Sequence, residues 1–179
     1  LHKLRYLHLD SNRINDLSPL SGLAELTVLC VNSNNIREMP SLHCPSLQRF
    51  ELSRNKICSV PENSLRGLPM LNHLNISSNQ LIAVSGDEVS SCALLQTLIL
   101  SENQLTVLPV PLRLPLLKNL RMNLNRISNL ESWCHSDNQP WPFCAPSLQK
   151  LILSDNQIER IPTELLDCCL LLEELDLSF

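Results

Sequence analysis

The chain is poor in aromatic residues, with six among its 179 residues. Hydrophobic residues still make up 44% of the chain, so aliphatic side chains must build most of any buried core. Glycine is also scarce, with three residues against twelve prolines. This balance is unusual for a compact fold with many tight turns, because such turns commonly use glycine.

The chain also lacks a basic stripe, a long apolar run and a catalytic motif. Its fourteen basic and eighteen acidic residues are spread along the sequence, which argues against a nucleic-acid partner. The longest apolar runs, such as Leu170 to Leu172 after two cysteines, are too short for membrane insertion. A glycine-rich phosphate loop, a nucleophile elbow and an HExxH motif are all missing. We therefore predict a non-enzymatic chain without a cofactor.

What the sequence does contain is one eleven-residue pattern that recurs along its whole length. The first copy, LRYLHLDSNRI, runs from Leu4 to Ile14. Further copies start at Leu26, Leu47, Leu71, Leu95, Leu117 and Leu148, and a shortened eighth copy starts at Leu172. Successive starts are 22, 21, 24, 24, 22, 31 and 24 residues apart, a period typical of stacked structural repeats.

The shared pattern, LxxLxLxxNxL, resembles that of the leucine-rich repeat superfamily, and the resemblance covers essentially the whole chain. The mixed 22-residue and 24-residue spacings resemble its intracellular type. The resemblance implies an α/β-type solenoid, a horseshoe with a concave parallel sheet and a convex side of 3₁₀, short helical or irregular returns. Residues 1–179 are then a single array of seven full repeats and a truncated eighth. We expect this array to be an interior slice of a longer solenoid, flanked by further repeats or domains.

The repeat also has a physical interpretation, position by position. Apolar and polar residues alternate in each LxLxx segment, as in a half-buried strand. Leu7 and Leu29 should therefore point inward, and His8 and Cys30 outward. Seven asparagines follow the strands in register, where a side-chain amide can bond the backbone of two neighbouring coils. This predicted structural ladder consists of Asn12, Asn34, Asn55, Asn79, Asn103, Asn125 and Asn156.

The outward-facing columns predict where a partner binds. Small polar residues dominate two of the columns, so basic and aliphatic residues at equivalent positions stand out. A basic spot beside Glu51 and an apolar spot around Arg121 resemble the composition of interface cores, although scattered exposed aliphatics need no functional explanation. The predicted partner-binding residues on this face are Arg49, Glu51, Arg54, His73, Ile99, Arg121, Leu124 and Ile152.

The 31-residue spacing predicts an extended loop over residues 131–147. It contains both tryptophans, Trp133 and Trp141, which either anchor a partner or pack on the flank of the solenoid. Cys134, His135 and Cys144 suggest zinc, but structural zinc usually takes four ligands in paired spacings. We therefore predict no metal site in this loop.

The eight cysteines are scattered rather than clustered, which favours a reducing compartment. We expect a cytoplasmic protein, with the nucleus or a cytoskeletal or ciliary structure as further options. The predicted function is a scaffold or targeting module that binds another protein. Two alternatives stay open. One is an extracellular or receptor ectodomain segment, in which the sequon at Asn75 would carry a glycan. The other is a regulatory part of a larger enzyme.

Overall fold

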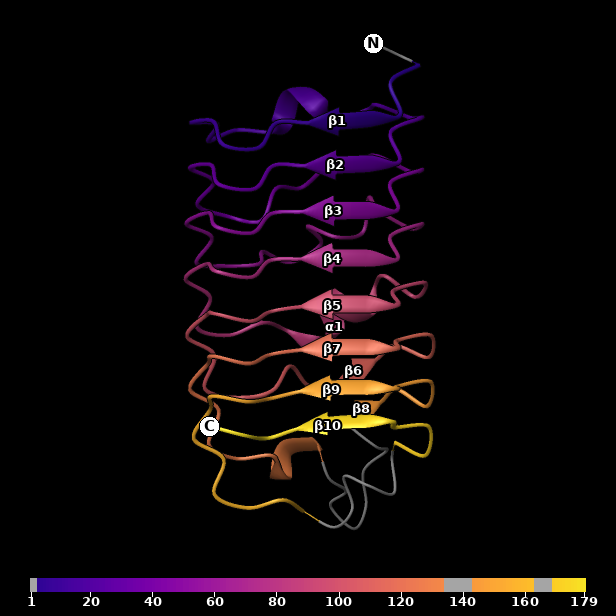
Figure 1. The fold of residues 1–179 in the computed structure, drawn as a ribbon. Coiled ribbons are helices and arrows are strands. Elements are labelled where there is room, and N and C mark those ends of the chain that lie inside the picture. Colours follow the sequence, from indigo (N-terminus) through magenta and orange to yellow (C-terminus); the bar gives the residue numbers. More distant parts are fainter. Residues whose placement is uncertain (1–2, 134–142, 163–168) are drawn as a thin grey trace.

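The computed structural model describes residues 3–133, 143–162 and 169–179. The chain winds into a stack of coils, and each coil contributes one short strand to the same sheet (Figure 1). Every neighbouring pair in this sheet is parallel. The eight strands, in their order across the sheet, are β1 (Tyr6–His8), β2 (Val28–Cys30), β3 (Arg49–Glu51), β4 (His73–Asn75), β5 (Thr97–Ile99), β7 (Asn119–Arg121), β9 (Lys150–Ile152) and β10 (Glu174–Asp176).

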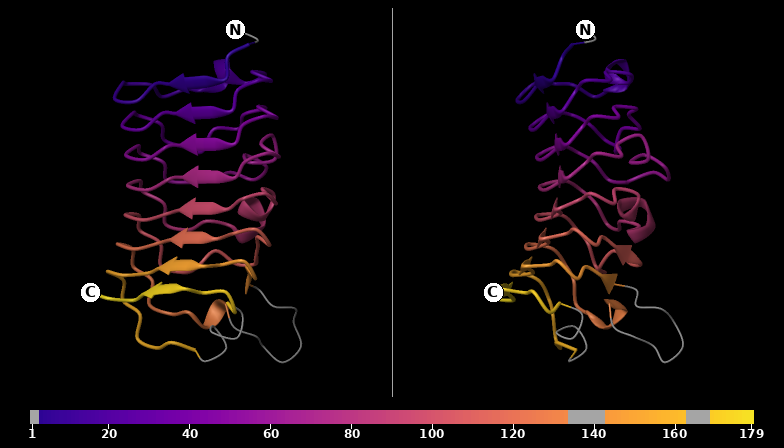
Figure 2. Two further views of the ribbon diagram at one scale, coloured as in Figure 1. Left: turned by 45° about the vertical axis from the view of Figure 1, so that its right-hand side comes forward. Right: turned by 90° about the vertical axis from the view of Figure 1, so that its right-hand side faces the viewer.

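The return segments that connect the strands form the opposite side of a gently curved stack (Figure 2). They are mostly irregular, with a few short elements. These are the 3₁₀ helices η1 (Ser18–Leu20) and η2 (Glu131–Trp133), the helix α1 (Gly86–Ser90), and the short parallel strands β6 (Leu112–Arg113) and β8 (Phe143–Cys144). The predicted fold class is therefore confirmed. The described residues include no helix long and apolar enough to cross a membrane.

The core follows the predicted alternation. The middle residue of each strand points into the stack, so Leu29 and Phe50 are fully buried and Leu7, in the first strand, is partly buried. Phe50 is the one aromatic residue among the buried side chains described, and leucine, isoleucine and valine supply most of the rest. Cys44 and Cys92 fill fully buried sites on the return side.

The turns after the strands reach left-handed backbone without glycine. In each of seven coils the residue just before the ladder asparagine has a φ of 52° to 58°. These residues are Ser11, Ser33, Arg54, Ser78, Glu102, Leu124 and Asp155. Arg54 and Leu124 were predicted to belong to an outward column of the strands, and that placement is wrong, because the strands end earlier and the chain is already turning.

Two of the three glycines are used for close packing of neighbouring coils instead. A Cβ atom on Gly67 would lie 2.0 Å from the carbonyl oxygen of Leu42, and one on Gly86 would lie 2.0 Å from that of Pro111. No side chain fits at either distance. The scarcity of glycine therefore reflects a fold in which polar and even aliphatic residues occupy the left-handed turns.

The asparagine ladder has the predicted geometry. In the fifth coil, Nδ2 of Asn103 donates to the carbonyl of Ile76 in the preceding coil (3.0 Å) and to that of Leu100 in its own coil (3.0 Å). Its Oδ1 accepts the backbone N–H of Leu81, again from the preceding coil, at 3.0 Å. The same three-way pattern recurs at the other buried ladder residues, which are Asn34, Asn55, Asn79, Asn125 and Asn156.

Two members of the ladder show that the bonds between coils require a preceding coil but not a constant spacing along the chain. Asn12, in the first coil, is exposed and bonds only Leu9 and Asp10 within its own turn. Asn156 follows the 31-residue spacing and still bonds Met122 and Ile127 of the preceding coil. The long excursion therefore leaves the contact between these two coils intact.

Replacing a ladder asparagine should destabilise the stack far more than replacing its neighbour. Asn103→Ala leaves the N–H of Leu81 and the carbonyl of Ile76 without their buried partner, so the free energy of unfolding should fall by about 1–3 kcal/mol. Gln104→Ala, the control, changes a half-buried side chain outside the ladder and should have a much smaller effect. Chemical denaturation of both variants measures the difference, and equal losses would contradict the assigned role.

Candidate functional site

The sheet exposes two parallel rows of side chains on its outer face, because the first and third residues of each strand point away from the core. The strand register aligns these residues from coil to coil. The first row is Tyr6, Val28, Arg49, His73, Thr97, Asn119, Lys150 and Glu174. The second row is His8, Cys30, Glu51, Asn75, Ile99, Arg121, Ile152 and Asp176.

A buried carboxylate organises the middle of this face. Glu51 is 6% exposed although it points outward, because neighbouring side chains cover it. Its Oε1 forms ion pairs with the guanidinium of Arg49 and with Nε2 of His73, the latter at 2.9 Å. The His73 Nε2–H is not aligned for a directional hydrogen bond with this oxygen. The predicted residues Arg49, Glu51 and His73 thus form one polar cluster.

Asn75, which was not among the predicted partner-binding residues, completes this cluster. Its Nδ2 donates to Oε2 of Glu51 at 2.7 Å, and its Oδ1 accepts the backbone N–H of Ser77 at 3.0 Å. Both ends of the amide are therefore engaged.

The surroundings of Glu51 act on its pKa in opposite directions. Burial acts most strongly and raises its pKa. The close approach of His73, the hydrogen bond from Asn75 and the positive charges of His73 and Arg49 together outweigh burial, so the pKa of Glu51 lies below its usual value of 4.5. The carboxylate is therefore ionised at neutral pH, and it pairs with Arg49 of the predicted basic spot.

The predicted apolar spot is smaller than the sequence suggested. Ile99, Arg121 and Ile152 are direct neighbours across β5, β7 and β9, but Ile152 is only 9% exposed. It is therefore not an exposed aliphatic. Leu124 is 46% exposed but lies in the turn beyond the sheet. What remains on the face is half-buried Ile99 beside Arg121, whose Nε donates to Oδ1 of Asn119 at 3.3 Å.

A second set of side-chain bonds joins the coils just beyond the strands. Oδ1 of Asp10 accepts the backbone N–H of Asn32 (2.7 Å), and Oδ1 of Asn32 accepts both the N–H and the hydroxyl of Ser53 (2.8 Å each). Further along the stack, Ser101 donates to Asn123 at 2.6 Å. The sequence shows that small polar residues dominate these positions, two residues beyond the second row. Their hydrogen bonds to the next coil could not be predicted from it.

The remaining predicted site residues belong to the extended loop. Trp141, and residues 134–142 as a whole, lie outside the described residues. The backbone of Trp133 ends η2, but its side chain is not described, and the same holds for Cys144 in β8. Whether the tryptophans bind a partner or pack on the solenoid therefore stays a prediction.

Comparison with protein families agrees with the repeated coils and the asparagine ladder. A family model described as "Leucine rich repeat" matches residues 26–81 and 45–105. A two-copy leucine-rich repeat model matches residues 2–42, and a single-repeat model matches residues 147–169. The chain belongs to the leucine-rich repeat family.

Solved leucine-rich repeat structures share this fold. An internalin (inlF) of Listeria monocytogenes superposes with a TM-score of 0.79 and 26% identity, over 98% of this chain and 48% of that one. Internalin C2 from the same bacterium gives a TM-score of 0.74 at 27% identity, over 96% of this chain and 69% of its own.

Curated sequences match shorter stretches. Human leucine-rich repeats and immunoglobulin-like domains protein 3 is 41% identical over 71 residues, which are 37% of this chain and 6% of that protein. Pig fibromodulin is 33% identical over 70 residues, which are 38% of this chain and 48% of that protein. The matched region thus spans less than half the length of either relative. Leucine-rich repeat domains are generally protein-binding modules and typically non-catalytic.

The Glu51 cluster gives a pH-dependent prediction. Because the pKa of Glu51 is lowered by folding, its stabilisation is fully present above the unfolded-state value near 4.5 and is lost as the pH falls through the lower folded-state value. Glu51→Gln should therefore lower the free energy of unfolding by about 1–3 kcal/mol at pH 7.

The difference between Glu51→Gln and the wild type should shrink as the pH falls below about 4.5. Urea denaturation across this pH range measures it, with the exposed Glu62→Gln as the control. If the difference in free energy of unfolding between the two proteins stayed constant into strong acid, the ionised carboxylate would not be the stabilising species.

Proposed function

We propose that this leucine-rich repeat chain is a protein-binding scaffold or targeting module whose partner docks on the outer face of the parallel sheet. The observation that carries the proposal is that Arg121 of β7 stands in register between Ile99 of β5 and Ile152 of β9, with half-buried Ile99 as the accessible aliphatic group beside it. Arginine beside aliphatic groups is the composition of an interface core. The return segments lie on the opposite side of the stack (Figure 2), which leaves this face accessible.

The size and charge of the face also suit a protein partner. With neighbouring strands about 4.8 Å apart, eight strands extend over roughly 34 Å, enough for the approximately 800 Å² per partner of a standard interface. Two basic side chains of this face are already paired, Arg49 with Glu51 and Lys150 with Glu174. The face therefore offers no continuous positive surface for a phosphate backbone.

Charge reversal at Arg121 should weaken partner binding without unfolding the chain, because the half-buried side chain makes only one side-chain bond, to Asn119. A photo-crosslinking residue at Thr97 or Asn119 should capture the partner in cells, and Arg121→Glu should reduce the cross-linked product by about tenfold or more, on the scale of an interface hot spot.

Exposed Arg66, on the return side, provides the matched control. A cross-linking residue placed at position 66 should not yield the same product, and Arg66→Glu should leave capture from Thr97 unchanged. Capture from the return side alone would contradict docking on the sheet.

We further propose that the chain is of the intracellular type and works in the cytoplasm. Within the described residues, Cys30, Cys44, Cys58, Cys92 and Cys169 are all free thiols. Burial raises the pKa of Cys92 and of Cys169 to about 11, so these side chains stay protonated and behave as small apolar groups. Their positions support a reducing compartment better than a disulfide framework.

Thiol counting tests this compartment. Protein from its native source, denatured and alkylated without prior reduction, should show all eight cysteines of the chain modified. In the folded chain, exposed Cys58 should react first, and buried Cys92 should react only on the timescale of unfolding. Any pair that becomes reactive only after reduction would instead favour the extracellular alternative.

A further inference from the structure

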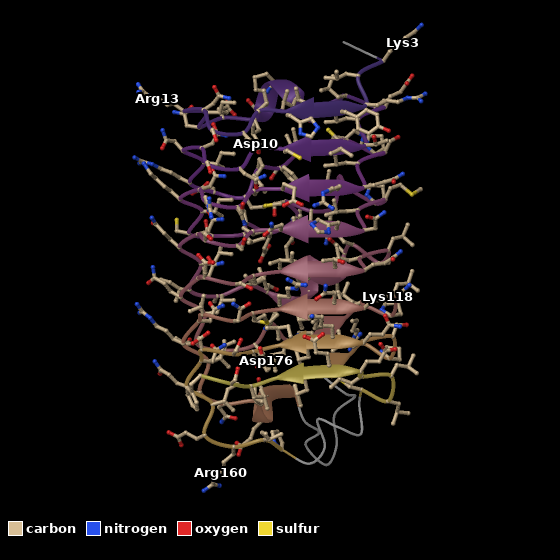
Figure 3. The ribbon with its side chains drawn as sticks, viewed as in Figure 1. Lys3, Asp10, Arg13, Lys118, Arg160 and Asp176 are labelled. Carbon is tan, nitrogen blue, oxygen red and sulfur yellow. The ribbon has the colours of Figure 1, made fainter. Side chains whose placement is uncertain are left out.

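Three side chains of different chemistry converge at the edge of the outer face formed by β1 and β2. His8 and Cys30 are register partners at the carboxyl ends of these two strands. Asp10 follows His8 by two residues and lies just beyond the end of β1, where Figure 3 labels it. An imidazole nitrogen, a carboxylate oxygen and the thiol sulfur all lie within 4.8 Å of one another.

From this convergence we propose that His8, Asp10 and Cys30 form a zinc-binding site with three protein ligands and one open coordination position. Imidazole, thiolate and carboxylate are the three ligand types that zinc uses. A sulfur and a nitrogen ligand together disfavour magnesium and calcium, which take oxygen ligands. The proposal does not depend on the proposed partner-binding function.

The geometry fits a tetrahedral ion after a small movement. With metal–ligand distances of about 2.0–2.3 Å, ligand atoms around tetrahedral zinc are roughly 3.5 Å apart. The three ligand atoms would therefore draw together by up to about 1.3 Å. His8 is exposed and can adjust, whereas buried Cys30 provides the fixed point.

One of the ligands, Asp10, is oriented by its surroundings. Oδ1 of Asp10 accepts the backbone N–H of Asn32 at 2.7 Å, which orients the carboxylate and leaves its second oxygen for an ion. Such outer hydrogen bonds are a regular feature of metal sites. They tie Asp10 of the first coil to the coil that carries Cys30, so a bound ion would link two coils that already share a contact.

The carboxylates of Asp10 and Glu51 place negative charge near Cys30, which attracts a cation. Zinc binds the thiolate form of cysteine, so coordination would displace the Cys30 proton to the solvent as the Zn–S bond forms.

This site differs from the sequence-based expectation of no metal, in which Cys134, His135 and Cys144 of the extended loop were the zinc candidates. His8, Asp10 and Cys30 are 2 and 20 residues apart in sequence, and no short motif links them. Only the pairing of two successive coils brings them together.

Titration of the chelator-treated full chain with Zn²⁺ and with Co²⁺ tests the proposal. One ion should bind per chain at this site, and Co²⁺ should show a thiolate-to-metal charge-transfer band together with the intense visible bands of tetrahedral cobalt. Cys30→Ser should abolish the charge-transfer band. His8→Gln and Asp10→Asn, both exposed positions, should each weaken Zn²⁺ binding by at least the roughly 10–100-fold that loss of an outer-shell partner produces.

Two controls separate this site from other thiols. Cys58→Ser removes an exposed cysteine elsewhere, and the double variant Cys134→Ser with Cys144→Ser removes the loop cysteines. Both should bind as the wild type does. Binding that survives Cys30→Ser, His8→Gln and Asp10→Asn, or that disappears in the loop variant, would overturn the proposal. Because two of the three ligand variants change only exposed side chains, unfolding of Cys30→Ser would not obscure the outcome.

Discussion

The structure depends on a side-chain amide that joins each coil to the one before it. Asn103 and its equivalents donate to one carbonyl of the preceding coil and accept one of its backbone N–H groups. These backbone groups lie in turns, where they have no partner in a sheet ladder, and leaving them buried and unbonded would destabilise the fold. The same bonds fix the offset between coils, so the strands meet in register. The rows of side chains on the outer face are a consequence of that register.

The ladder and the inward-facing leucines could be predicted because they depend on spacing alone. The backbone conformation of the turns could not be predicted in the same way. Ser11, Glu102 and Leu124 share a left-handed φ but no side-chain chemistry, so the sequence carries no common signal for it. Arg54 and Leu124 were misplaced on the strands for this reason. The burial of Ile152 was also missed, because it depends on how closely its neighbours cover it rather than on its own position.

The chemistry of the outer face depends on pairs of coils rather than on single repeats. Arg49 and Glu51 come from one strand, His73 and Asn75 from the next, and the cluster exists only because these strands are adjacent. The convergence of His8, Asp10 and Cys30 has the same origin. The residue types at one outward position of successive repeats identify candidates such as His73 and Arg121. They do not indicate which of these side chains neutralise or orient one another.

The left-handed turns restrict how this surface can change during evolution. A valine, isoleucine or threonine before the ladder asparagine would be strained, because β-branched side chains clash in that conformation. Serine, aspartate, glutamate, arginine and leucine are present there, so charge and polarity can vary freely within that limit. The rim beside the sheet can therefore acquire new electrostatic character one coil at a time, while the adjacent asparagine and the spacing of the coils stay unchanged.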